Sequence, residues 1–369
     1  MKKVRTNYEK NIDSLILDLN TKLDQINKKI DYILQDMECY AYQTQLLNIV
    51  GMNREGESIL DTKKRFFRLL SVTDPYMLLK QKGSLLLLKR FINICEQRKL
   101  RYWVSYGALL GAVRHSGFIP WDDDIDVCMP RKDYEELLRV ADDEDFQTVF
   151  WYHVKGAFRI KKLIFRNHKN DWFLDIFPFE ESTISPKKAK DVYKQYKRIL
   201  LDNLKDENVI LYDCWIEKET LDRIKNIYDT VCTSYLAELS HTKITAQNPA
   251  TAQEHQYTQV PTTDQGHYRA QAQQDIVFVN PVDGPEINLE RNGYILPIED
   301  VFPCKTLIFA QQKINVMNNY QRFLEEFYGD YMSLPKDIYT HQHVKNTVSA
   351  QYIAESEEFL KEITIRREL

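Results

Sequence analysis

Residues 121–129 read WDDDIDVCM, so four carboxylates stand within five positions directly before an apolar run. Such crowding is costly, because unit charges about 4 Å apart repel by about 4 kcal/mol at an effective dielectric constant of about 20. The apolar run predicts a strand over 124–129 that ends before Pro130. Alternate side chains of a strand share a face, so we expect Asp122, Asp124 and Asp126 on one face and Asp123 on the other.

A divalent cation would relieve this repulsion, and carboxylates two positions apart suit a hard ion such as Mg²⁺. The best further ligand is Asp175, which stands alone in the apolar segment LDIFP of 174–178 and should not be buried without a partner. A salt bridge from Asp175 to Arg159, Lys161 or Arg166 is the alternative. The acidic run is also compatible with a solvated loop or, at one position, with a helix cap.

Upstream of the acidic run, Gly107 leads a helical pattern that follows a short aromatic strand expected over 102–105. Backbone N–H groups and the dipole at such a helix start can hold a phosphate. The common glycine-rich phosphate loops are absent from the chain. We therefore expect any phosphate to bind at this turn, next to the carboxylates.

The chain has 369 residues and a formal net charge of −4, from 50 basic and 54 acidic residues. With 43% hydrophobic and 28% charged residues it is typical of globular domains, which excludes wholesale disorder, a collagen-like repeat and an unusually basic nucleic-acid binder. No apolar stretch of about 18 residues and no apolar segment after the basic start MKKVR are present, so we expect neither a membrane-spanning helix nor a cleaved signal peptide. The six cysteines form no Cys-x-x-Cys pair, which favours reduced cytosolic thiols.

The first fifty residues carry a helical pattern whose apolar positions alternate spacings of three and four, as in the a and d positions of a heptad repeat. These positions are Ile12, Ile16, Leu19, Leu23, Ile26, Ile30, Ile33, Met37 and Tyr40. The pattern predicts either a coiled coil that oligomerises the protein or a long amphipathic helix that packs on its own core. The mixture of Ile and Leu at these positions does not specify how many helices such a coiled coil would contain.

After a break at 51–57, the remaining patterns alternate between helix and strand. Helices are expected at about 59–70, 76–99, 131–141, 187–204, 215–240, 318–329 and 349–367, and strands at about 147–155, 158–165, 172–178, 276–279 and 306–309. The segment 245–274 is rich in Gln, Thr and Ala, which predicts a long solvated loop or a lid.

The segment 106–126, YGALLGAVRHSGFIPWDDDID, resembles the signature of the LicD family of bacterial phosphocholine transferases, relatives of the fukutin-type ribitol-phosphate transferases. Residues 174–178 resemble the second motif of that family, and 328–335, YGDYMSLP, resemble its C-terminal motif. The resemblance spans about 90–335 and implies an α+β fold with a nucleotidyltransferase-like small mixed β-sheet flanked by helices. The helical patterns add the N-terminal long helix or coiled coil outside it. We therefore expect a helical or coiled-coil segment at 1–57, a transferase domain at 58–345 with the polar insert at about 245–274, and a C-terminal helix at 346–369.

The same resemblance implies that Asp124, Asp126 and Asp175 are the catalytic residues and the ligands of Mg²⁺, or of Mn²⁺ in its place. The implied substrate-binding residues are Gly107, Arg114, His115, Asp122 and Arg166. Arg166 belongs to a basic strand, with Arg159, Lys161 and Lys162, that faces either the donor or solvent. One departure from the family is Ala108, where Ser or Thr is usual, so one hydroxyl contact to phosphate is missing.

The implied reaction moves an alcohol phosphate, with phosphocholine as first choice, from a CDP-linked donor to a hydroxyl of a cell-surface glycan or lipid-linked sugar, and releases CMP. The alternatives are a ribitol- or glycerol-phosphate transferase, a nucleotidyltransferase that uses an NTP and releases pyrophosphate, and a scaffold with a decayed site. Choline would need aromatic faces, and four tryptophans near the motifs form either such a cage or part of the core. The expected location is the cytoplasm, either in solution or peripheral at the inner face of the membrane, with no nucleic-acid partner and with self-association through 12–40.

Overall fold

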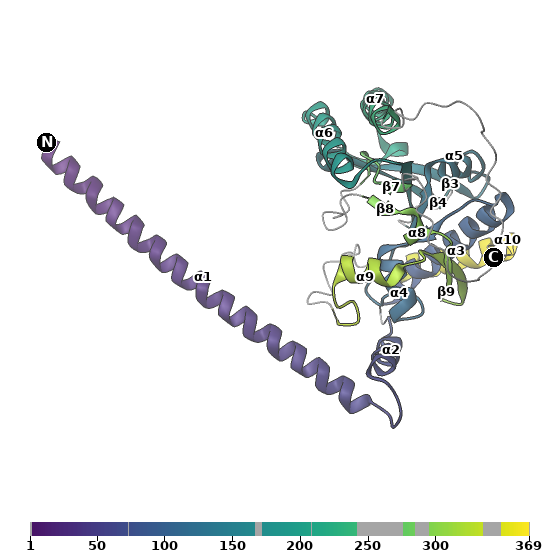
Figure 1. The fold of residues 1–369 in the computed structure, drawn as a ribbon, viewed down its shortest axis with the longest axis horizontal. Helices are drawn as coiled ribbons and strands as arrows, with labels where there is room; N and C mark the ends of the chain where they lie inside the picture. The colour runs from purple at the N-terminus through teal and green to yellow at the C-terminus, as the bar shows by residue number, and fades with distance from the viewer. Residues whose placement is uncertain are drawn as a thin grey trace, which may run out of the picture. The chain divides into compact units, whose positions relative to one another are not determined.

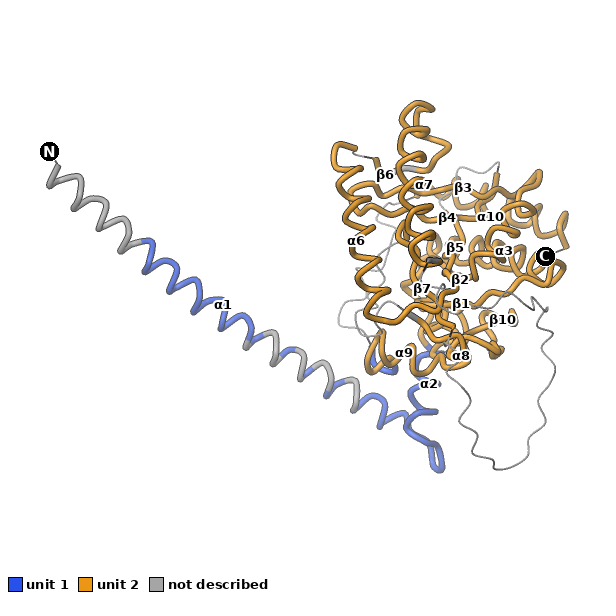
Figure 2. Tube along the Cα trace, turned by 45° about the horizontal axis from the view of Figure 1, so that its top comes forward, with its two compact units in different colours: residues 1–69, 332–338 blue, residues 70–331, 339–369 orange. Residues whose placement is uncertain are grey.

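The computed structural model describes residues 2–72, 74–166, 172–207, 209–241, 276–284, 295–334 and 348–368. The chain divides into two compact units, which Figure 2 shows in blue and orange. One unit comprises residues 1–69 and 332–338, and the other comprises 70–331 and 339–369. The Gln-rich segment 245–274 lies outside the described residues. The expected division at 57 and 345 stays a prediction.

The first unit contains two helices, α1 (Lys2–Met52) and α2 (Ile59–Leu69), where the sequence predicts them. The turn between them includes Gly56, whose φ of +78° favours glycine. Glu57 holds this turn, because its carboxylate accepts bonds from Arg65 at 2.6 Å and from Thr62 at 3.0 Å. Arg65 also donates to the carbonyl of Met52 at 2.5 Å, so one guanidinium satisfies the end of α1.

The second unit is built on a mixed sheet with the order β6-β3-β4-β5-β2-β1-β10-β9, to which β7 and β8 are attached through β5. Figure 1 shows helices around this sheet. The strands are β1 (Trp103–Val104), β2 (Asp126–Pro130), β3 (Phe146–His153), β4 (Phe158–Phe165), β5 (Leu174–Ser182), β6 (Ile210–Tyr212), β7 (Val277–Val279), β8 (Ile295–Pro297), β9 (Lys305–Phe309) and β10 (Gln312–Val316). β2 runs parallel to β5, and β1 runs antiparallel to β2 and parallel to β10. The expected mixed sheet is therefore confirmed.

Helices flank this sheet, as expected. They are α3 (Pro75–Arg98), α4 (Tyr106–Arg114), α5 (Arg131–Val140), α6 (Pro186–Leu204), α7 (Lys218–His241), α8 (Ile298–Val301), α9 (Tyr320–Tyr328) and α10 (Ala350–Arg367). Among the described helices, none has the length and apolar character needed to cross a bilayer. The nucleotidyltransferase-like fold and the coiled coil stay predictions.

The sequence missed three short strands, β6, β8 and β10. Two of them have only three residues, and β10 reads QKINV, with polar residues that weaken its apolar pattern. Pairing explains β10, because its five residues form an antiparallel ladder with β9 and Val316 pairs with Val104 of β1. Tertiary pairing can therefore form a strand that local propensity does not predict.

The core of the second unit lies between the sheet and the helices α3 and α10. Gly83 of α3 allows close approach, because a Cβ there would lie 2.5 Å from the fully buried indole of Trp172. Phe165 of β4 contacts both Trp172 and Phe359 of α10 edge to face, with centroids 6.0 and 5.3 Å away. Cys95 and Cys128 are buried here, and the cysteines within the described residues are free thiols, as expected.

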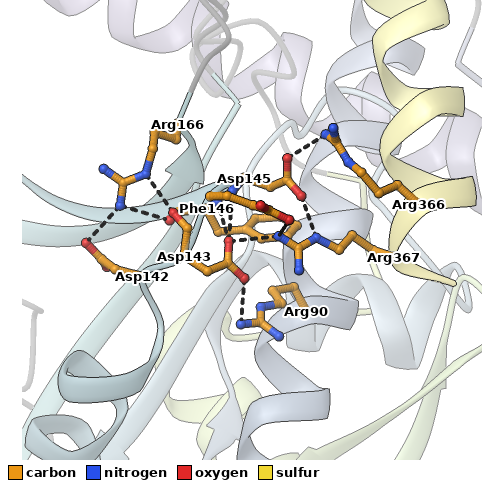
Figure 3. A network of polar contacts seen from close by, with 9 residues as sticks. Arg90, Asp142, Asp143, Asp145, Phe146, Arg166, Arg366 and Arg367 are labelled. Carbon is orange, nitrogen blue, oxygen red and sulfur yellow. Dashed lines mark hydrogen bonds and ion pairs between the residues drawn. The ribbon is translucent and has the colours of Figure 1, made fainter.

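Arginine–aspartate pairs tie α10 to the segment before β3 (Figure 3). Asp145, whose side chain is only 6% exposed, accepts hydrogen bonds from Arg366 at 2.5 Å and from Arg367. Asp143 lies 3.0 Å from Arg90 of α3 and 3.2 Å from Arg367. Charged hydrogen bonds therefore fix the last turn of α10 to the segment just before β3, and the same segment is bound to α3.

We predict that Asp145→Ala lowers the free energy of unfolding by about 1–3 kcal/mol, because two guanidinium groups lose a buried acceptor. Chemical denaturation of the full chain measures this change. The matched control is Glu144→Ala, since Glu144 lies 3.3 Å from Arg367 but is 77% exposed. We expect the control to change stability by less than about 0.5 kcal/mol. Equal effects of the two substitutions would contradict the assigned role of Asp145.

Candidate functional site

The site is built around the start of α4. Ser105 lies beside β2, where its N–H donates to the carbonyl of Asp126 at 3.1 Å. The next residue, Tyr106, has a φ of +47°, an uncommon conformation for a residue other than glycine. Its half-buried ring packs against Phe323 and Phe327 of α9, with centroids 5.7 and 5.4 Å away. This packing fixes the direction in which α4 leaves the sheet.

Gly107 leaves room for a carboxylate on the first turn of α4. A Cβ at this position would lie 2.4 Å from Oδ2 of Asp122, which is too close for any side chain. Asp122 therefore approaches the N-terminal end of the helix, where negative charge is favoured. The structure brings these two predicted site residues together, and the requirement for glycine comes from this approach.

Three carboxylates from two strands meet beside this helix start. The parallel pairing of β2 with β5 places Asp126 opposite Asp175. Asp124 precedes β2 directly, and Asp124, Asp126 and Asp175 each offer an oxygen atom within 4.8 Å of the others. Carboxylate oxygens at this spacing could hold a hard divalent cation.

Exposure alternates along the acidic run as the sequence predicts. Asp123 and Ile125 are buried, whereas Asp122, Asp124 and Asp126 are half-buried. The regular strand begins only at Asp126, two residues later than expected. The residues before it are held by contacts with α3 and, at Ile125, by a hydrogen bond from the N–H of Asp175 to the Ile125 carbonyl at 3.0 Å.

α3 anchors the acidic run through three polar side chains. Nζ of Lys80 lies 2.6 Å from Oδ2 of Asp123, and both side chains are at most 1% exposed. Gln81 donates to the carbonyls of Ile119 and Asp122 at 3.2 and 2.7 Å. Ser84 donates to the carbonyl of Asp123 at 3.3 Å. The sequence reasoning missed this anchor, although polar residues at positions 80, 81 and 84 interrupt an apolar helix at the spacing of one face.

Lys162 is the basic residue of β4 that reaches the carboxylates. It is paired in register with Asp175, and its Nζ lies 2.5 Å from Oδ1 of that residue. The ammonium also lies 3.4 Å from the ring centroid of Phe173, a cation–π arrangement. The sequence named Lys162 only as part of a basic strand and offered Arg159, Lys161 and Arg166 as salt-bridge partners of Asp175; the pairing with Lys162 corrects that alternative.

The other basic residues of β4 point elsewhere. Alternation places Arg159 on the opposite face, where it lies 2.8 Å from both Asp283 and Asp229. Arg166 donates to the carbonyl of Asp143 at 2.7 Å and lies 3.6 Å from Asp142, in the network of Figure 3. The structure therefore does not bring Arg166 to the carboxylates, because it stands four residues beyond Lys162, about 13 Å along the strand.

The electrostatics of the cluster reflect unbalanced negative charge. Burial raises the pKa of Asp126 well above its ordinary value, and the charges of Asp124, Asp175 and Asp122 raise it further, while Lys162 opposes the shift. Burial and then the charge of Asp124 raise the pKa of Asp122 in the same direction. Positive charge placed among these carboxylates would have the opposite effect.

Arg114 and His115 end α4 next to this cluster. Arg114 is buried, and its Nη1 donates to the carbonyl of Tyr331 at 3.1 Å. Burial lowers the pKa of Arg114 to about 10, so it remains a cation at neutral pH, and the charges of Tyr328 and Asp122 oppose this shift. Burial and the charge of Arg114 lower the pKa of His115 to about 3. A neutral imidazole of that kind is a weak base at neutral pH.

Tyr328, at the end of α9, is an aromatic residue that the cluster influences. Burial raises the pKa of its phenol, and the charges of Asp126, Asp122 and Asp124 raise it further. Tyr328 is the first residue of the C-terminal motif 328–335. Its phenol lies within electrostatic range of the three carboxylates.

The four tryptophans near the motifs divide into two groups. Trp103 and Trp172 are fully buried and belong to the core. Trp121 and Trp151 are half-buried, and the indole of Trp151 lies 5.5 Å from Nζ of Lys162. Only the second group has the exposure that a cage for a quaternary ammonium would need.

The fold and the site define a mixed-sheet domain with clustered carboxylates beside a helix start, and residues 99–204 match the family described as LicD/FKTN/FKRP, nucleotidyltransferase domain. This segment contains the carboxylates, Gly107, Arg114 and Lys162. Residues 99–204 therefore carry a LicD-type domain, as the motifs predict.

Two transferases are similar to the chain. The lipopolysaccharide cholinephosphotransferase LicD of Haemophilus influenzae is 25% identical over 266 residues, which are 68% of this chain and 89% of that protein. The ribitol 5-phosphate transferase FKRP of Mus musculus is 34% identical over 96 residues, which are 24% of this chain and 18% of that protein. The FKRP of Homo sapiens matches to the same extent.

We predict that Lys80→Met lowers the free energy of unfolding by about 3–5 kcal/mol, because it removes the ammonium beside a buried carboxylate. The double variant Lys80→Met/Asp123→Asn should recover most of this loss, since the remaining group is uncharged. Chemical denaturation of both variants provides the measurement. A single variant within about 1 kcal/mol of the parent would show that Asp123 does not depend on Lys80.

We predict that stability falls in mild acid partly through His115. The folded pKa of about 3 lies below the ordinary value of 6.5. Between these values only the unfolded chain binds the proton, so the stabilisation is complete above the unfolded pKa and decreases as pH falls. Between pH of about 7 and about 5, the parent should lose about 1–2 kcal/mol more than His115→Gln, with allowance for partial exposure. Parallel stability curves for the two proteins would contradict this prediction.

Proposed function

We propose that the protein transfers an alcohol phosphate from a CDP-linked donor to a hydroxyl of a glycan and releases CMP. Phosphocholine is our first choice of transferred group, and ribitol phosphate or glycerol phosphate is the alternative. The support is the LicD-type domain together with the names of the two relatives, both of which transfer a substituted phosphate. A glycan acceptor is supported by the lipopolysaccharide named for the Haemophilus influenzae relative.

The single observation that carries the proposal is the meeting of Asp124, Asp126 and Asp175 beside the start of α4. Their oxygens are of the kind that Mg²⁺ or Mn²⁺ binds, and their mutual repulsion favours a cation. The chemistry that such an ion supplies when bound is neutralisation of charge on the phosphates and on the leaving CMP. We therefore propose these three residues as its ligands.

The residues around the cluster have complementary roles in this proposal. The guanidinium of Arg114 and the ammonium of Lys162 place positive charge on two sides of the carboxylates and would attract the donor's phosphates. The backbone N–H groups at Gly107 supply donors that require no side chain, which compensates for the missing hydroxyl at Ala108. Trp121 and Trp151 are the aromatic residues with exposure suited to choline.

The decisive experiment incubates the full chain with Mg²⁺, a glycan acceptor and a panel of CDP-choline, CDP-ribitol and CDP-glycerol, and measures CMP. We predict that Asp126→Asn reduces the rate of CMP release by at least about 100-fold, because it removes a carboxylate from the cluster. The matched control is Asp191→Asn on the exposed surface of α6, which should retain the parent rate.

Two outcomes would contradict the proposal. An Asp126→Asn variant as fast as the parent would show that the cluster is not the catalytic site. Release of pyrophosphate from an NTP, without CMP release from any CDP-alcohol, would instead support a nucleotidyltransferase.

A further inference from the structure

The helix α1 exposes a continuous apolar seam. Eight seam residues have described side chains, and each is between 47% and 69% exposed. They are Ile16, Leu19, Leu23, Ile26, Ile30, Ile33, Met37 and Tyr40. A single surface-exposed apolar residue needs no explanation, but a stripe repeated over more than three heptads marks an interface.

The seam has the composition of a coiled-coil interior. Its spacing assigns Ile16, Leu23, Ile30 and Met37 to a positions and the other four residues to d positions. No charged residue interrupts either set between 16 and 40. Two copies of the seam are therefore complementary to each other, because each offers side chains that fill the holes between those of the other.

The flanking positions bring no net repulsion between two copies. In a parallel pair, a g residue faces the e residue five positions later on the other helix, so Lys22 faces Asn27 and no like charges meet. In an antiparallel pair, g positions face g positions. In the register that aligns all eight seam residues, Lys22 then faces Asp36 of the other copy twice and Lys29 faces Lys29 once, so attraction outweighs repulsion.

The charges of α1 argue against a lipid surface as the occupant. Helices that lie on membranes are rich in Lys and Arg on their polar face. α1 has seven basic and seven acidic residues, so it has no net attraction for anionic lipids.

We infer that residues 12–40 associate with the same residues of a second copy of this chain as a coiled coil. The inference does not depend on the transferase activity. The coiled coil would join two or more copies of the transferase domain.

The test measures the mass of the full chain in solution by light scattering after size-exclusion chromatography. We expect a multiple of the 43.8 kDa chain mass for the parent. The double variant Ile26→Asp/Ile30→Asp should run at the mass of one chain, because it places charges in the seam. The matched control Thr21→Asp/Lys28→Asp alters f positions on the opposite face of the helix and should keep the parent mass.

Two results would overturn the inference. A parent chain with the mass of a single copy at the highest soluble concentration would overturn the inference, whether it floats with lipid vesicles or not. A seam variant that keeps the parent mass would also overturn it, because the association would then use another surface.

Discussion

The structure depends on holding like charges together. Asp122, Asp124, Asp126 and Asp175 crowd one place at the edge of β2 and β5, and their repulsion would disperse them if the backbone were free. The parallel ladder fixes Asp126 opposite Asp175, and Asp122 approaches the first turn of α4 where a Cβ at Gly107 would displace it. The burial of the surrounding core offsets this repulsion, and under our proposal a cation would relieve it further.

The support for this crowding comes from the opposite face of the same segment. Lys80 neutralises the one buried member of the run, Asp123, and Gln81 and Ser84 bind the carbonyls around it. α3 in turn packs on Trp172 at the position of Gly83, next to the start of β5. One helix therefore aligns both strands that carry the carboxylates. Buried polar contacts of this kind are valuable for geometry more than for net stability.

The sequence anticipated much of this arrangement, for reasons that are local. Alternation along the acidic run separated Asp123 from its neighbours, and the lone Asp175 in an apolar strand indicated a polar partner. The sequence could not identify which basic residue in or next to β4 pairs with Asp175, because the pairing depends on the register between β4 and β5. That register brings Lys162 to Asp175, whereas Arg166 binds within the hydrogen-bond network that includes α10. The sequence also missed β10, whose polar residues become a strand only through pairing with β9 and β1.

What the sequence determined by itself was the set of elements and the motifs, since periodicity and turn residues act over a few positions and the LicD signature is continuous in the chain. What only the tertiary structure decided was which charges meet. Lys80 lies 43 positions before Asp123, and Tyr328 about 200 positions after Asp126, and no local pattern links them. Contacts over such separations are fixed by packing and strand order, because these determine which side chains share one small, poorly hydrated space.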